Sequence, residues 1–578
     1  TLLGLFCSTY AQEINRFINQ DDLFGTRVFV ENHGQFDNAV PGEKKVLYAL
    51  DNGLEQVYFT PTGLVYKITR VYPLTEKELE AMERGDNTIK QRTKTLFVNM
   101  EWLGAGQAQV DAAEKQNHYM TYGSNEMNSM TFKKLIYRNI YPNIDIEYII
   151  PGDKKYGIKY SFIVRPGGNP DDIKIFYGGD VRKIKPGNNG EMIIQTGLDD
   201  IVEHAPVSYN GNTNIASLFT EKENVIGFEF PKGYDNTKPL VIDPWVTVLT
   251  TLTTNEYAYD VDFDYNGNTY VYGGYNPFKV AMFNSLGVLQ WTFGGTVASI
   301  TPAWSSAPIL SQASNFAVNK FNGKSYIGQG YVGNGNRVVR LDAAGNYDNF
   351  VNTPTQQFQE VWDMGFHCAT NNVFVLGGGT YTNNSGATLD ATTAAITLST
   401  FQPTNNSIAQ DVVSNAIDDQ GKIFIIYASG ITGLNNKMCL INSTFNGNIW
   451  TQPSTFNSFS EQGNKSQYQG AGSLSSNGFN CLAVNANYLY YYDGFNLSAY
   501  NKATGVLVAA TTLTTTLKRQ GGIAVDDCDN LYLGGYGNIL SYHFNGSSFS
   551  ALPSLSLGSA GPGTPYVYDI KMDKQTKI

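Results

Sequence analysis

The sequence predicts an all-β protein with an N-terminal β-sandwich-like domain over residues 15–245 and a β-propeller over residues 246–578. Three observations predict this fold class. Gly (58 residues) and Tyr (37) are abundant, as in β proteins that are rich in tight turns. Apolar and polar residues alternate in many short runs, whereas long helical patterns are nearly absent. A hairpin pattern recurs from residue 261 almost to the end of the chain, which is typical of repeated blades.

The first residues predict export. Residues 1–11 contain an apolar run and then small residues at Thr9 and Ala11, the pattern of a secretory signal peptide near its cleavage site. A starting Met and a charged segment are missing, so we expect the beginning of this signal to be clipped. Cys7 follows the bulky Phe6, which fits a lipoprotein signal poorly. No other apolar run approaches the roughly 18 residues that cross a bilayer, so we expect a secreted or surface-attached protein without a transmembrane segment.

Short alternating runs predict the strands of the N-terminal domain. Residues 144–150, 158–164 and 173–179 alternate apolar and polar side chains, so each strand has one buried and one exposed face. Stacked sheets bury such faces most simply. One helix is predicted, from Thr75 to about residue 84, because Thr75 and Glu78 have the spacing of a capping box.

The same domain resembles a known family. The segments that carry the resemblance are Phe-Val-Glu-Asn-His-Gly-Gln (29–35), Ile-Tyr-Pro-Asn-Ile-Asp (140–145), Tyr-Ser-Phe-Ile-Val-Arg-Pro-Gly (160–167) and Leu-Val-Ile-Asp-Pro (240–244). They are similar to the N-terminal β-domain of large exported Bacteroidota proteins, where it precedes a β-propeller of SBBP type. His33 departs from the Lys of that pattern, at a surface turn. The resemblance implies type IX secretion through a C-terminal sorting domain and a context of gliding-associated adhesion, and it implies no catalytic residues.

The C-terminal half repeats one design. Its first copy, residues 261–274, has a strand, an Asn-Gly turn and a second strand that ends at Gly-Gly. The aligned positions before each turn are Asp262, Asn319, Ala369, Asp418, Asn485, Asp526 and Asp573. Their spacings, from 41 to 67 residues, bracket a four-stranded blade with variable loops. They predict six complete blades and the start of a seventh, and since an unfinished blade leaves an open edge, we expect the natural chain to continue past Ile578.

The first of these turns is also a candidate calcium site. Asp262, Asp264 and Asn266 match the first half of an EF-hand loop, in which oxygens at alternate positions converge on a hard cation. The acid expected at the twelfth position is Gly273, and a tight hairpin turn prefers the same residue types. Calcium and a purely structural turn are therefore the two interpretations, and the turn is the stronger one.

Other reactive residues give weaker patterns. Cys368, Cys439, Cys481 and Cys528 lack the CxxC spacing of zinc or redox sites, so we expect buried thiols, and disulfides between them stay open. Glu360, Asp363 and His367 lie within eight residues, but on a strand Glu360 would face away from the other two. The sequence therefore predicts no catalytic residues, and we expect a protein that is not an enzyme.

Charge and aromatic residues bound the function. The net charge is −11 and no basic cluster is present, which argues against nucleic acid as a partner. Aromatic residues near the repeats could stack on a glycan or anchor a surface protein, although packing between blades explains them equally well. They are Trp304, Trp362, Tyr468 and 488–492. We therefore expect a binding or adhesion protein that uses the propeller as an interaction platform, with a polysaccharide lyase or hydrolase and a rigid spacer as the alternatives.

Overall fold

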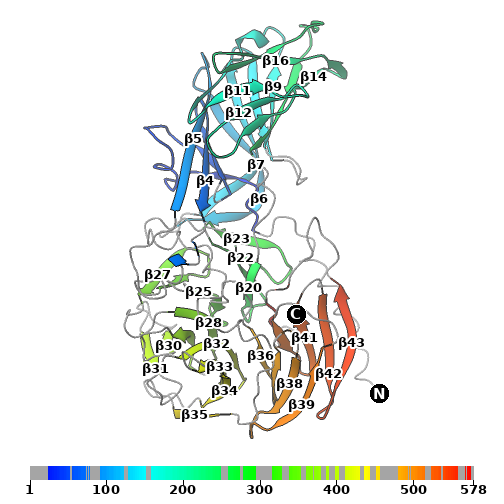
Figure 1. Ribbon diagram of the computed structural model, residues 1–578. Coiled ribbons are helices and arrows are strands. Elements are labelled where there is room, and N and C mark those ends of the chain that lie inside the picture. Colours follow the sequence, from blue (N-terminus) through cyan, green and yellow to red (C-terminus); the bar gives the residue numbers. More distant parts are fainter. Residues whose placement is uncertain are drawn as a thin grey trace.

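The structure is a computed structural model of the chain. It describes residues 24–52, 55–72, 75, 77–78, 92–122, 128–150, 158–248, 258–273, 278–294, 316–328, 337–352, 360–368, 370–378, 386–389, 398–401, 410–429, 435–442, 451–455, 480–492, 494, 496–513, 522–535, 538–556, 567 and 569–573. The predicted signal-peptide remnant, residues 1–11, lies outside the described residues. Figure 1 shows two β-rich bodies, the N-terminal domain and the propeller.

The N-terminal domain is built from strands β1 to β19 and one 3₁₀ turn, η2 (Pro170–Asp172). The strands are β1 (Phe29–Glu31), β2 (Tyr48–Asn52), β3 (Glu55–Thr60), β4 (Gly63–Tyr72), β5 (Arg92–Trp102), β6 (Gln109–Thr121), β7 (Asn128–Tyr141), β8 (Ile144–Ile149), β9 (Ile158–Val164), β10 (Ile175–Gly179), β11 (Lys183–Pro186), β12 (Met192–Gln195), β13 (Ile201–Glu203), β14 (Val207–Asn210), β15 (Thr213–Ile215), β16 (Leu218–Lys222), β17 (Val225–Glu229), β18 (Leu240–Asp243) and β19 (Trp245–Val248). The predicted alternating runs are thus strands β8, β9 and β10.

These strands form a curled sheet around one core. Antiparallel pairing runs without a break from β16 through β17, β10, β5, β4, β3, β2, β1, β7, β8, β9 and β18 to β14. Strands far apart in this order meet inside: the rings of Trp102 on β5 and Tyr137 on β7 lie 4.9 Å apart, edge to face. The sandwich-like packing follows because central strands such as β5, β8 and β10 bury one face in this core.

One carboxyl group is buried in this core. Glu203 is 1% exposed and accepts hydrogen bonds from the hydroxyl groups of Tyr160 (2.8 Å) and Tyr177. Burial outweighs these two bonds and raises the pKa of Glu203 to about 7.

The predicted capping box is present. The backbone N–H of Thr75 donates to Glu78 Oε2 over 2.7 Å, and the N–H of Glu78 donates to Thr75 Oγ1 over 3.4 Å. These bonds satisfy N–H groups at a helix start, where the helix itself offers no acceptors. The remainder of the predicted helix lies outside the described residues.

The described residues of the propeller form six four-stranded units. Their strands are β20 (Ala258–Phe263), β21 (Thr269–Gly273), β22 (Lys279–Phe283), β23 (Leu289–Phe293); β24 (Phe316–Val318), β25 (Ser325–Gly328), β26 (Arg337–Leu341), β27 (Tyr347–Asn352); β28 (Glu360–His367), β29 (Asn372–Gly378), β30 (Gly386–Leu389), β31 (Leu398–Phe401); β32 (Gln410–Ile417), β33 (Ile423–Ser429), β34 (Asn435–Asn442), β35 (Thr451–Thr455); β36 (Leu482–Val484), β37 (Tyr488–Tyr492), β38 (Asn496–Asn501), β39 (Leu507–Thr512); and β40 (Ile523–Val525), β41 (Asn530–Gly534), β42 (Asn538–Phe544), β43 (Phe549–Ser556). We number these units blades 1 to 6. The first strand of each blade packs beside the first strand of the next, from β20 to β40.

The turns between the first and second strands of blades 1, 4 and 6 share one geometry. In blade 4 the carboxylate of Asp418 accepts the N–H groups of Gln420 and Lys422, and in blade 6 Asp526 accepts those of Cys528 and Asn530. In blade 1 the residue with this role is Asp264. The alignment of Asp262 with the later turns was therefore wrong by two residues, because the side chain that closes the turn belongs to the first residue after the strand.

The last described segment packs against blade 6. The N–H of Val567 donates to Gly535 O over 3.1 Å, and a Cβ atom on Gly522 would lie 2.6 Å from the backbone N of Ile570. Gly522 also has φ +85°, so both space and conformation favour Gly there.

The N-terminal domain is joined to the propeller by a shared strand edge. Strand β6 pairs in parallel with β23, the outer strand of blade 1, through Tyr119 to Thr121. Thr121 donates its hydroxyl to Gly345 O over 2.6 Å, and Trp291 donates its indole N–H to Ala343 O over 3.1 Å. Hydrogen bonding is therefore continuous from the N-terminal domain into blade 1, as Figure 1 shows at β6 and β23.

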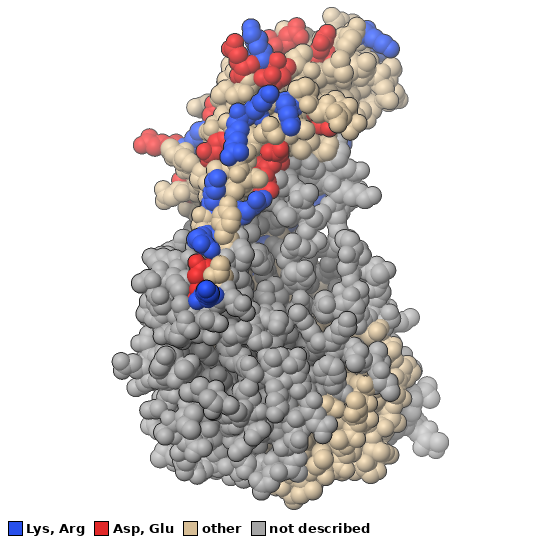
Figure 2. Space-filling view, in the orientation of Figure 1, with Lys and Arg blue, Asp and Glu red and all other residues tan. Residues whose placement is uncertain are grey.

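These observations confirm the all-β fold class with a sandwich-like domain and a propeller. No helix of the described residues is long and apolar enough to cross a membrane. The structure gives Cys368, Cys481 and Cys528 as thiols, of which Cys481 is fully buried, while the side chain of Cys439 is outside the described set. Lys, Arg, Asp and Glu are interspersed on the visible face of the N-terminal domain, which shows no field of one sign (Figure 2).

Candidate functional site

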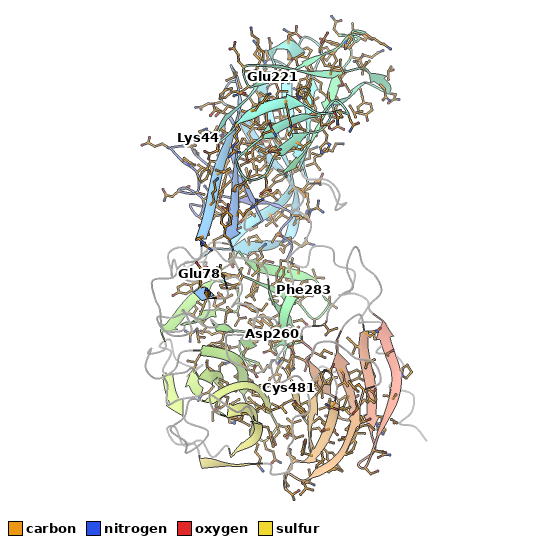
Figure 3. All side chains as sticks on the ribbon, in the orientation of Figure 1. Lys44, Glu78, Glu221, Asp260, Phe283 and Cys481 are labelled. Atoms are coloured by element: carbon orange, nitrogen blue, oxygen red, sulfur yellow. The ribbon has the colours of Figure 1, made fainter. Side chains whose placement is uncertain are left out.

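Charged side chains gather at the centre of the propeller. The first strands of blades 1, 3 and 4 each contain a β-bulge, and the residue that follows the extra one is polar: Asp260, Asp363 and Ser414. A β-bulge changes the direction in which the neighbouring side chain points. Figure 3 shows Asp260 near the middle of the blades.

Asp363 is bound to the next blade. Its Oδ2 accepts the backbone N–H and the side-chain amide of Asn415 on β32, each over 2.7 Å, and its Oδ1 accepts the N–H of Met364 over 2.8 Å. Burial raises the pKa of Asp363 to about 7, against the opposing attraction of Lys571 and these three donors.

Asp260 and Asp569 form a carboxyl pair across the closure of the ring. Asp569 Oδ1 accepts the side-chain amide of Asn480 over 2.8 Å. Asp260 Oδ1 and Asp569 Oδ2 are buried and accept no hydrogen bond from another group. Burial and then the charge of Asp569 raise the pKa of Asp260 well above its usual range. Protonation of Asp260, which this shift favours, would supply a hydrogen-bond donor to the carboxyl pair.

Lys571 supplies the balancing positive charge. Its ammonium lies 3.5 Å from Asp569 Oδ2, and its side chain keeps 28% of its surface exposed. Burial alone would lower the pKa of Lys571, but Asp569, Asp260, Asp363 and Asp262 together outweigh this and raise it. The ammonium therefore stays charged at neutral pH and attracts carboxylates from blades 1 and 3 at once.

Asp262 forms a second link between blades. Its Oδ2 accepts the N–H of Val318 on β24 over 2.7 Å, and its Oδ1 pairs with the ammonium of Lys320. Lys320 also lies 3.9 Å from the ring centre of Phe263. Burial lowers the pKa of Lys320, and Asp262 opposes that shift.

The centre thus has groups suited to proton transfer, but most of them already have partners. Asp363, with its pKa of about 7, could exchange a proton near neutral pH. Its two oxygens nevertheless accept three hydrogen bonds from β28 and β32. The same holds for Asp262, which bonds to blade 2. The arrangement therefore ties neighbouring blades together.

The predicted calcium ligands do not converge. Asp262 faces blade 2. Asp264 Oδ2 instead accepts hydrogen bonds from the side-chain amide of Asn268 (2.8 Å) and the hydroxyl of Tyr270 (3.0 Å). Asn266 contributes its backbone N–H to Asp264 and is exposed. Among the described residues no group of three or more acidic, His or Cys side chains could hold a metal ion. Calcium at this turn stays a prediction without support from this geometry.

The other residues singled out from the sequence lie apart or in the core. His367 contacts Thr370 Oγ1 and Gly421 O over 2.7 Å each, away from the Asp363 contact with Asn415, and the side chain of Glu360 lies outside the described set. Tyr490 and Tyr492 are buried, and the Tyr492 hydroxyl donates to Gly534 O of blade 6 over 2.8 Å. These tyrosines pack between blades. Trp304, Tyr468 and the Trp362 side chain lie outside the described residues.

Sequence reasoning missed Asp569 and Lys571. A signal was present: Tyr-Ala-Tyr-Asp at 257–260 returns as Tyr-Val-Tyr-Asp at 566–569. This copy identifies 567–573 as the counterpart of β20, and it places Asp569 opposite Asp260 when the ring closes. What no pattern shows is that Lys571 meets an acid from blade 3, because that contact spans more than 200 residues.

Comparison with known proteins adds a family for the N-terminal domain. Residues 29–245 match the family model "Domain of unknown function (DUF7948)". A comparison with curated proteins gives no match. The match ends where β19 begins, so it covers the N-terminal domain and leaves the propeller out.

We compare the chain with three of the solved structures to which it is weakly similar. One is described as a mitotic checkpoint complex (11% identity, 55% of this chain and 83% of that chain, TM-score 0.36). The second is a streptogramin B lyase (12%, 61% and 90%, TM-score 0.33). The third is a virginiamycin B lyase from Staphylococcus aureus (9%, 68% and 98%, TM-score 0.34). These scores carry no argument about what the chain does.

Proposed function

We propose that the chain is a binding protein that presents a β-propeller as an interaction platform at or outside the cell surface. The observation that carries the proposal is the state of the propeller centre, where Asp262 and Asp363 are bonded to the next blade. Charges held in this way stabilise a ring, and a ring with one rigidly attached domain is suited to present surfaces to partners.

The proposed partners are a glycan or a surface protein, and the proposed location is extracellular. Support comes from the predicted signal-peptide remnant and from the resemblance of residues 25 to 245 to exported Bacteroidota proteins. That resemblance also supports type IX secretion and a gliding-associated adhesive role, as parts of the same proposal.

The test is a screen of the recombinant chain against glycans and purified surface proteins, with and without calcium. A bound partner is then mapped by hydrogen exchange. Protection on propeller strands is the expected result. Binding of nothing in either condition, or protection confined to the N-terminal domain, would contradict the platform role.

A polysaccharide lyase or hydrolase is the second candidate, and one observation favours it. Burial raises the pKa of Asp363 to about 7 and raises the pKa of Asp260 well above its usual range, so the centre contains two carboxyl groups that can exchange protons outside the usual acidic range. Asp363→Asn keeps its size and removes its charge. If the wild type releases short products from a polysaccharide and Asp363→Asn does not, the chain is an enzyme.

A further inference from the structure

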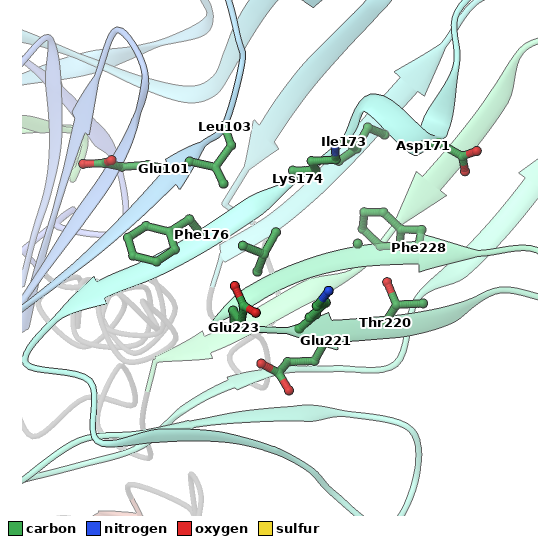
Figure 4. A pocket seen from close by; sticks show the side chains of 13 residues that line it. Glu101, Leu103, Asp171, Ile173, Lys174, Phe176, Thr220, Glu221, Glu223 and Phe228 are labelled. Carbon is green, nitrogen blue, oxygen red and sulfur yellow. The ribbon is translucent and has the colours of Figure 1, made fainter.

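A groove on the N-terminal domain differs in kind from the propeller centre. It is lined by residues on or next to β5, η2, β10, β16 and β17, it reaches the core residues Ile173 and Phe228, and its volume is about 730 Å³ (Figure 4). That size accommodates a small ligand or a few sugar units. Its lining includes the partly buried side chains of Phe176 on β10 and Val225 on β17, and the exposed Leu103, which follows β5.

Two glycines shape the floor of this groove. A Cβ atom on Gly178 would lie 2.8 Å from Phe176 Cε1, so the half-buried ring of Phe176 lies along β10 in the space that a side chain would fill. Gly227 pairs with Thr220, and a Cβ atom there would lie 3.0 Å from Thr220 Oγ1 and 3.6 Å from Ile173 O. The result is a hollow with a flat aromatic ring on one side.

The rim offers hydrogen-bonding groups that the chain leaves unused. Lys174 and Lys222 are exposed, and neither ammonium forms an ion pair with any residue in the described part of the chain. Thr220 presents its hydroxyl beside them. Glu101 is paired with Lys44 over 2.6 Å, and Glu221 accepts the N–H of Asn224 over 3.0 Å. Donors and acceptors therefore alternate around an apolar floor.

The charges on the rim are mixed. Four carboxylates and two ammonium groups line the groove, and Lys44 offsets one carboxylate: they are Glu101, Asp171, Glu221, Glu223, Lys174 and Lys222. A phosphate or sulfate would meet the carboxylates, and a purely apolar ligand would strip water from all six charged groups. A neutral ligand with many hydroxyl groups can use both the donors and the acceptors while one of its faces rests on an aromatic ring.

We propose that this groove binds a neutral oligosaccharide, with a pyranose ring stacked on Phe176 and its hydroxyl groups bonded to Lys174, Lys222 and Thr220. This site lies on the N-terminal domain and does not depend on the platform role of the propeller. Only one geometric feature distinguishes it from an ordinary sheet face: Gly178 lets the aromatic ring lie flat.

The test uses the full chain on an array of neutral oligosaccharides built from glucose, mannose, xylose or N-acetylglucosamine. A sulfated oligosaccharide and a Lys-rich peptide are included as separate arms. We expect at least one neutral oligosaccharide to be retained, and Phe176→Ala to weaken its binding at least about tenfold. Phe176→Trp, which keeps a flat ring, should retain binding.

Matched variants distinguish loss of the Phe176 stacking surface from a general loss of folded structure. Gly178→Ala should weaken binding by displacing the Phe176 ring, whereas Gly106→Ala, where a Cβ atom meets nothing within 4 Å, should not. Leu218→Ala, an exposed position (52%) on β16 outside the groove, is the control for surface apolar residues. Retention of no neutral oligosaccharide, preference for the sulfated sugar or the peptide, or unchanged binding by Phe176→Ala would each overturn the proposal.

Discussion

The propeller centre and the groove on the N-terminal domain both contain carboxylates and lysines, but they use them differently. At the centre, Lys571 is surrounded by acids from blades 1 and 3 and from its own segment. In the groove, Lys174 is exposed and has no ion pair among the described residues. Charged groups with internal partners stabilise the fold, and charged groups without them are available to a ligand. The comparison therefore separates an architectural cluster from a binding site on the basis of unused hydrogen-bonding capacity.

The largest expected effect is the loss of the central ammonium. Lys571→Met should lower the free energy of unfolding by about 3 kcal/mol, because it leaves Asp260, Asp569 and Asp363 without their common cation. Urea unfolding measures this. If the variant is as stable as the wild type, the central charges do not hold the ring together and the comparison fails.

The second effect is a dependence of stability on pH. Asp363 and Glu203 both have a folded pKa of about 7, raised from ordinary values near 4. Between these values the folded chain holds a proton that the unfolded chain releases. The stabilising contribution is therefore complete below pH ~4 and is lost as the pH rises to about 7, by on the order of 1 kcal/mol per pH unit for each group.

Two variants assign that slope to its sources. The slope is the change in the free energy of unfolding per pH unit. Asp363→Asn should remove the contribution of one proton in the propeller, and Glu203→Gln should remove the contribution of one proton in the N-terminal domain. The measurement is urea unfolding at several pH values from about 3 to about 8, which extends about one unit beyond each end of the shift. A slope that neither variant changes would show that these carboxyl groups are ionised in the folded chain.

The third effect tests how the ring closes. Gly522→Ala should lower the free energy of unfolding by about 1–2 kcal/mol more than Gly211→Ala. Both glycines have positive φ (+85° and +63°), so the backbone cost is shared, but only a Cβ atom at 522 meets the backbone of Ile570. Equal losses would mean that 569–570 does not pack against Gly522.

The smallest effect is expected in the groove. Lys174→Met should change the free energy of unfolding by less than about 0.5 kcal/mol, because the exposed ammonium has no ion pair to lose. Thermal unfolding beside Lys571→Met makes the comparison direct. A loss as large as that of Lys571→Met would show that Lys174 has a structural role.

Much of the architecture could be predicted from the sequence because it depends on neighbours along the chain. The alternating runs became β8, β9 and β10, and the Thr75 and Glu78 spacing gave the capping box. The residue types of the turns were predicted correctly, but the position that closes the first turn was assigned to Asp262 instead of Asp264. That residue faces blade 2 because two residues of strand and turn separate it from the position that caps the hairpin.

The sites themselves depend on contacts between distant residues. Asp363 and Lys571 meet because the ring brings the first strands of separate blades together, and no spacing predicts their shared charge. The groove requires Gly178 next to Phe176 on β10, and Gly227 on β17. Nothing in the sequence distinguishes either residue from an ordinary strand glycine. The aromatic runs suggested a binding surface, but Tyr490 and Tyr492 became buried contacts between blades.

The reactivity of individual lysines tests the central claim most directly. The folded chain is treated with an acetylating reagent, and the rate at each lysine is read by mass spectrometry and divided by its rate in the unfolded chain. We predict that Lys174 and Lys222 react freely and that Lys571 reacts at least about tenfold more slowly, because its raised pKa leaves little neutral amine. Acetylation of Lys571 as fast as Lys174 would contradict the distinction between a closed centre and an open groove.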